Sequence, residues 1–137
     1  MNLAEKLLQA DANKAKEKKK GTYISSKLGH ILGEKSVEIE ITELSGRRIS
    51  EIIGTSVNRN GEVDFSKSYD ANLMMCVEGI TSPNLRDKDL QAHFGVHNAK
   101  DLCEALFDTE VNEIAEAMST LSSLGDQKEN EEEIKNS

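Results

Sequence analysis

The sequence predicts an α+β fold that is predominantly helical: a small antiparallel β-hairpin followed by a bundle of four to five short helices, with an N-terminal helix ahead of both. Apolar and polar residues alternate from Val37 to Glu43, as in a half-buried strand. Apolar residues recur at helical intervals in several later segments, and leucines gather at the start of the chain. We therefore expect an N-terminal amphipathic helix (residues 1–20), a single α+β domain (21–124) and an acidic disordered tail (125–137).

The N-terminal segment is predicted as one helix over residues 2–19. Leu3, Ala4, Leu7 and Leu8 share one helical stripe, and no apolar residue follows Ala15 within the helix. A helix with a single apolar turn is marginal in water by itself. The three leucines therefore need either the core or another chain to cover them, and the sequence leaves both alternatives open.

The predicted hairpin pairs a strand at residues 22–26 with a strand at residues 37–43. Gly29 and Gly33 lie between the two strands and indicate a longer turn. The glutamates of the second strand alternate with its apolar residues, so we interpret them as a solvated sheet face and not as a pair of catalytic acids.

Two helices are expected next. A short one, capped by Ser45, runs to Ile53 and is closed by Gly54. Residues 57–64 are predicted as a loop, and a central helix follows from residue 66 to about residue 79, with Pro83 ending it. Its apolar stripe consists of Tyr69, Leu73, Cys76, Val77 and Ile80, with Met74 and Met75 beside the stripe.

Three further helices complete the predicted bundle. The first covers residues 88–94 behind the cap Asp87, and the second covers residues 99–107 behind the cap Asn98. The last begins at residue 108 or 109 and keeps helical spacing for nearly four turns. Its apolar residues are Val111, Ile114, Ala115, Met118, Leu121 and Leu124.

Charge and composition exclude several classes of function. The formal net charge is −8, and the segment from Asp101 to the C-terminus holds eleven acids against two lysines. One short lysine run, at residues 14–20, is too little for a nucleic-acid-binding face. We expect no membrane segment and no secretory signal, and hence an intracellular protein whose two cysteines are reduced and buried.

Residues that could hold a metal or act in catalysis are scattered. His93 and His97 are four positions apart, with Cys76 and Cys103 as further candidate zinc ligands, but Gly95 interrupts the helix between the histidines and no ligands are paired closely. No nucleophile stands in a recognisable catalytic motif, and no glycine motif cradles a phosphate. We expect no enzymatic activity, no cofactor and no metal, with a zinc-dependent structural module as a remote alternative.

The central part of the chain resembles a known family. Its order is a helix ending in Gly79-Ile80, then Pro83-Asn84-Leu85-Arg86-Asp87, then Leu90-Gln91-Ala92-His93-Phe94-Gly95-Val96, then Asp101-Leu102 and an acidic amphipathic helix. Upstream stand Lys27-Leu28-Gly29, a Val-Glu-Ile-Glu-Ile strand and a short Arg-bearing helix. Over roughly residues 3–124 this order resembles the XkdN-like tail assembly chaperones of phages and prophages of Gram-positive bacteria.

The resemblance implies a role in which the chain binds the tape measure protein, keeps it soluble and helps recruit tail tube subunits during tail morphogenesis. It also implies a location in the host bacterial cytoplasm, absence from the mature virion, and in many phages a longer frameshifted form. We expect homo-oligomers. The candidate partner-binding residues are Leu3, Leu7, Leu8, Val111, Ile114, Met118 and Leu121, of which the last four also suit the core. The alternative is a small acidic adaptor that binds a basic partner protein through residues 126–133.

Overall fold

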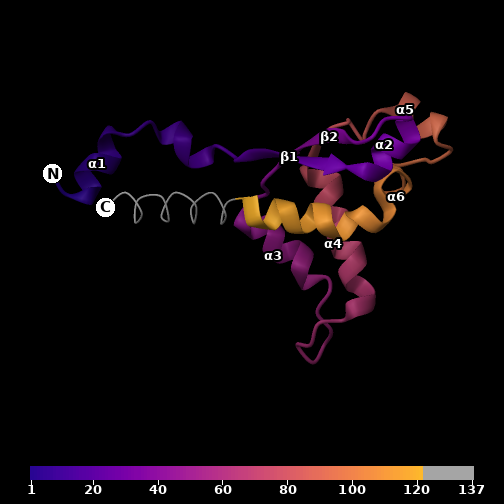
Figure 1. Ribbon diagram of the computed structural model, residues 1–137. Helices are drawn as coiled ribbons and strands as arrows, with labels where there is room; N and C mark the ends of the chain where they lie inside the picture. The colour runs from indigo at the N-terminus through magenta and orange to yellow at the C-terminus, as the bar shows by residue number, and fades with distance from the viewer. Residues whose placement is uncertain (122–137) are drawn as a thin grey trace.

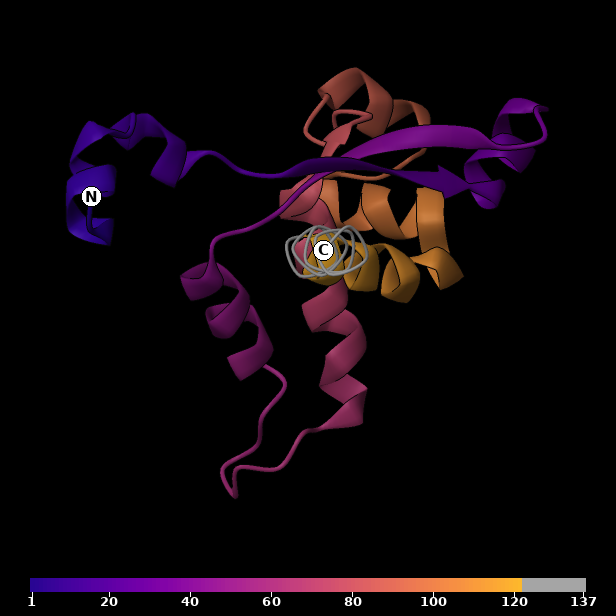
Figure 2. The same ribbon diagram turned by 60° about the vertical axis from the view of Figure 1, so that its left-hand side comes forward.

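The computed structural model describes residues 1–121, so Leu124 and the predicted acidic tail lie outside the described residues. Over those residues the fold is α+β and predominantly helical, as predicted. A three-stranded antiparallel sheet of order β1-β2-β3 lies across the helix of residues 111–121, while two helices, α3 and α4, extend from the other side of that helix (Figures 1 and 2). The described part of the chain has no helix of the length and apolar content that a membrane span requires.

Strands β1 (Lys20–Ser25) and β2 (Val37–Thr42) form the predicted antiparallel pair, in a register that sets Lys20 opposite Thr42 and Ser25 opposite Val37. Ile39 and Ile41 are each 1% exposed and form the floor of the core. The connection between the strands, predicted as a longer turn, is largely helical in the structure. The connection contains helix α2 (Ser26–Leu32), which begins where Ser25 Oγ accepts a hydrogen bond from Leu28 N and ends at Gly33, at φ 72°.

Helix α3 (Gly46–Gly54), capped by Ser45, confirms the short predicted helix. Helix α4 (Phe65–Gly79), capped by Asp64, confirms the central one. Met75, expected beside the apolar stripe, is instead buried within it. The chain then enters a third strand that the sequence did not predict: β3 (Ile80–Ser82) pairs with β2 and ends at a cis bond to Pro83.

The C-terminal helices agree with the predictions. Helix α5 (Lys88–His93) is capped by Asp87, and helix α6 (Ala99–Phe107) is capped by Asn98. A single turn, η2 (Asp108–Glu110), leads into the helix of residues 111–121. The fully buried side chains of these helices contact β2 and α4 to form one core: Leu102, Cys103, Leu106, Phe107, Val111, Ile114 and Met118.

The N-terminal segment differs most from expectation. The single helix predicted over residues 2–19 is instead a seven-residue helix, α1 (Leu3–Gln9), followed by extended backbone at Ala10 and a 3-10 helix, η1 (Ala12–Lys16). Neither element buries a residue. The last residue of this N-terminal arm (residues 1–19), Lys19, exchanges hydrogen bonds with Glu43, and the residues before it extend outward from β1 away from the rest of the fold (Figure 1).

Candidate protein-binding surfaces

Glu110 ties the sheet to the C-terminal helices. Its carboxylate accepts hydrogen bonds from Ser25 Oγ at 2.6 Å and from the backbone N–H of Ser26 at 3.1 Å, and Glu113 accepts one from the Tyr23 hydroxyl at 2.6 Å. Burial and these carboxylates raise the pKa of Tyr23 well above its ordinary value, so Tyr23 stays a donor at neutral pH. The polar residues at this junction are satisfied within the fold and serve its architecture.

The four residues considered for metal binding do not form one site. Cys76 and Cys103 are buried free thiols, whereas His93 and His97 are exposed. A hydrogen bond with Cys103 and burial raise the pKa of Cys76 far above its usual range, and an un-ionised thiol is a poor nucleophile. Within residues 1–121 no three His, Cys, Asp or Glu side chains are placed to hold a metal ion.

Three separate surfaces present apolar side chains to solvent. The first is the N-terminal arm, where Leu3, Leu7 and Leu8 are 72%, 64% and 86% exposed. Asn2 Oδ1 caps α1 by accepting a hydrogen bond from Glu5 N at 2.8 Å. A seven-residue helix with no buried contact gains little stability from its own hydrogen bonds. Its leucines are available to bind another apolar surface.

The second surface is the tip where α3 leads into α4, which we call the α3–α4 tip (residues 53–65). Its apolar side chains are 36–85% exposed, with Phe65 the most exposed at 85%. An isolated β-bridge between Val57 and Val63 closes the loop, and Gly61 takes a left-handed conformation in its turn. The predicted loop is therefore ordered like a small hairpin. Its apolar residues are Ile53, Val57, Val63 and Phe65.

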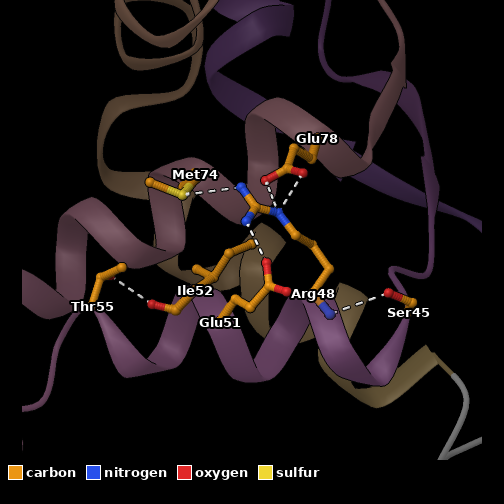
Figure 3. Close-up of polar contacts among 7 residues, drawn as sticks. All are labelled: Ser45, Arg48, Glu51, Ile52, Thr55, Met74 and Glu78. Carbon is orange, nitrogen blue, oxygen red and sulfur yellow. Dashed lines mark hydrogen bonds and ion pairs between the residues drawn. The ribbon is translucent and has the colours of Figure 1, made fainter.

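Arg48 joins α3 to the C-terminal end of α4, at the end of the helix pair away from this tip (Figure 3). Its Nε donates to both carboxylate oxygens of Glu78, at 2.8 and 3.0 Å, and its Nη1 donates to Glu51 Oε2 at 3.0 Å. The hydrogen bonds to Glu78, and then to Glu51, raise the pKa of Arg48 above its ordinary value. Because Met74 Sδ lies 3.6 Å from Nη2, the guanidinium also covers a methionine that would otherwise be more exposed.

The third surface is an open apolar groove of about 260 Å³ at the end of the sheet, lined by α2, β2, α5 and the residues around Pro83. It exists because β3 is short. Strand β3 pairs only with Glu40 and Ile41, so residues 37–39 of β2 have no strand on that side within the described chain. We call this the sheet-end groove. Its rim is formed by Ile31, Leu32, Val37, Pro83, Leu90 and Phe94.

The structure separates the residues that we considered for partner binding. Leu3, Leu7 and Leu8 lie exposed on the arm, as a binding role requires. Val111, Ile114 and Met118 are at most 2% exposed and belong to the core, because the sheet covers the face of the helix that carries them. Leu121 is half-buried and packs closely against Gly21 of β1, where an added Cβ would lie 2.6 Å from Leu121 Cδ1. The α3–α4 tip was missed, although four apolar residues in so short and polar a stretch were a signal.

A small helical α+β fold with three exposed apolar surfaces is typical of a protein that binds other proteins. The match to a family model identifies the kind of module. Residues 4–135 match the phage XkdN-like tail assembly chaperone proteins, and the chain belongs to this family. The match extends through the acidic C-terminal segment, beyond the residues 3–124 in which we noted the resemblance. Comparisons with curated proteins and with solved structures gave no match.

Proposed function

We propose that this tail assembly chaperone binds the tape measure protein of a phage tail through the α3–α4 tip, keeps it soluble and helps bring tail tube subunits to it. The observation that supports the proposal most directly is the exposure of Phe65. Soluble proteins seldom leave a phenylalanine 85% exposed beside further apolar residues unless another molecule covers them.

The tip also has the support that a binding surface needs. Asn58 Oδ1 accepts hydrogen bonds from Asn60 N and Glu62 N, which shape the loop. Asp64 caps α4 and receives hydrogen bonds from Ser66 that lower its pKa. These hydrogen bonds hold the loop and the start of α4 in one conformation, so binding orders few additional residues.

Charge suits the same role. The chain carries a net charge of −8, which keeps a complex with an apolar client dispersed by mutual repulsion. The rival function is an acidic adaptor that binds a basic protein through residues 126–133. It accounts for the negative charge but not for the exposed apolar side chains of the α3–α4 tip. The family match, which includes that segment, favours the chaperone. A chaperone of this kind acts in the host bacterial cytoplasm and is absent from the mature virion.

Co-expression with the tape measure protein encoded by the same phage tests the proposal. We expect the wild-type chain to keep the client in the soluble fraction, and Phe65→Ser to weaken the interaction about tenfold or more, since burying a phenylalanine contributes about 1.5–3 kcal/mol. Phe65→Leu is the matched control, because it keeps an apolar side chain at the same place, and it should retain most of the effect.

Two results would contradict the proposal. If the client stays insoluble with the wild-type chain present, the chaperone does not act on the tape measure protein. If Phe65→Ser protects the client as well as Phe65→Leu does, the client binds elsewhere. Deleting residues 125–137 separates the rival: an adaptor loses its partner, whereas the chaperone still protects its client.

A further inference from the structure

We propose that the N-terminal arm of one copy binds in the sheet-end groove of a second copy, so that the chains join head to tail. This contact is distinct from the client contact at the α3–α4 tip and does not depend on it. It brings together the two apolar surfaces that the proposed function leaves unused.

The two surfaces match in size and chemistry. The arm offers Leu3, Leu7 and Leu8, which lie on one side of α1 and are not buried by any of the residues 1–121. The groove offers about 260 Å³, walled by aliphatic and aromatic side chains, with Leu32 58% exposed at its rim. A cavity of about 150 Å³ holds one benzene-sized apolar group. The groove therefore has room for one or two leucine side chains, and not for a whole helix.

Charge favours the same pairing. The arm carries five lysines against three acids, and four of those lysines follow α1 within residues 14–19. The outer face of β2 presents Glu38 and Glu40, and Glu38 itself lines the groove. When leucines of α1 occupy the groove, the lysines that follow have this acidic strip beside them. Residues 20–121 carry 17 acids against 10 lysines and arginines, a net charge of −7, so repulsion between copies would oppose association without the basic arm.

The arm belongs in the groove of another copy because of where each lies. Lys20, at the base of the arm, pairs with Thr42 at one end of the sheet, whereas the groove adjoins Val37 at the opposite end. A six-residue strand separates the two by roughly 17–20 Å. The arm also leaves β1 at the end opposite α2 (Figures 1 and 2), and α2 supplies part of the groove lining. An arm at one end and a groove at the other give a heterologous contact, which continues from copy to copy unless it closes into a ring.

The test uses the purified full-length chain without any client. Light scattering should show wild-type oligomers that grow with concentration. Leu7→Glu disables the arm and Leu32→Glu disables the groove, and each should weaken self-association about tenfold or more, because a charge replaces a buried leucine. Both residues are exposed, so neither variant should unfold, which circular dichroism checks. Phe65→Ser, at the α3–α4 tip, is the control and should associate like the wild type.

Mixing the two variants gives the sharpest result. The Leu32→Glu chain keeps an intact arm, and the Leu7→Glu chain keeps an intact groove, so an equimolar mixture should form heterodimers that grow no further. A monomeric wild type at high concentration would overturn the proposal, as would a mixture that stays monomeric. Oligomers that persist in both variants would place the contact elsewhere. These outcomes leave the client-binding proposal untouched, since they are measured without the client.

Discussion

Gly29 lies inside α2, where the backbone that leads to β2 crosses the helix. A Cβ added at Gly29 would lie 2.7 Å from Ser36 Cα, 2.8 Å from Ser36 N and 2.9 Å from the carbonyl carbon of Lys35. Ordinary contacts begin near 3.4 Å, so the connection would have to move by about 0.7 Å. All three atoms belong to the backbone and cannot rotate away as the end of a side chain can. Gly29→Ala should therefore destabilise the fold.

The magnitude follows from two opposing effects. Forcing a methyl group into a packed site costs about 1–3 kcal/mol, whereas alanine in a helix gains about 0.5–1 kcal/mol over glycine. We expect Gly29→Ala to lower the free energy of unfolding by about 1–2 kcal/mol, which for a chain of this size lowers Tm by roughly 3–8 °C. Urea and thermal unfolding followed by far-UV circular dichroism measure both quantities.

Gly54 provides the matched control. It also lies in a helix, at the end of α3, but no atom approaches within 4 Å of a Cβ added there. Gly54→Ala should leave stability unchanged or raise it by up to about 1 kcal/mol. If Gly29→Ala is as stable as the wild type, or shifts stability in the same direction as Gly54→Ala, then Gly29 does not pack against the connection and the reasoning fails.

Two further changes test contacts of α4: the ion pair that joins it to α3, and the hydrogen bond of Tyr69 with Glu104 of α6. Arg48→Gln removes the ion pairs to Glu78 and Glu51 and should lower the free energy of unfolding slightly, with faster hydrogen exchange in α3. The loss should shrink in molar salt, and a variant as stable as the wild type at low salt would contradict the prediction. Burial and a hydrogen bond with Glu104 raise the pKa of Tyr69 to about 12 from 10.0. The folded state thus favours the neutral phenol, so the stability that Tyr69 contributes is fully present below pH 10 and is lost as the pH rises through 12. Between these pH values the free energy of unfolding should fall less for Tyr69→Phe than for the wild type. Identical pH profiles of the two proteins would refute the raised pKa of Tyr69.

Elements with a local signal were predictable from the sequence, and those set by tertiary contacts were not. Ser45, Asp87 and Asn98 mark helix starts because each cap acts on its own first turn. Strand β3 has three residues, and Ile80 continues the helical spacing of α4, so only its pairing with β2 makes it a strand. Gly29 resembles a turn residue in sequence, yet it is glycine because residues 35 and 36 approach it closely.

The candidate surfaces divide in the same way. The leucines of α1 were predictable, because a stripe on a polar helix indicates a need for cover whatever the fold is. The core positions of Val111, Ile114 and Met118 were not distinguishable from a binding face, since an amphipathic helix has the same pattern in both roles. The exposure of Phe65 depends on where α3 and α4 diverge, which the sequence does not show.

The distribution of apolar residues links these observations to function. A chain with 36% hydrophobic and 4% aromatic residues has few to spare, yet twelve large hydrophobic side chains of the described residues are exposed beside a core of eighteen buried ones. Scattered exposure would be ordinary, but most of these residues fall on the arm, on the α3–α4 tip or at the rim of the sheet-end groove. The tip protrudes from the rest of the fold (Figures 1 and 2), which suits contact with a separate client. The arm and the groove complement each other and lie at opposite ends of β1, which suits a contact between copies. Because the two proposed contacts use different residues, a copy joined to its neighbours in this way would still have its tip free for the client.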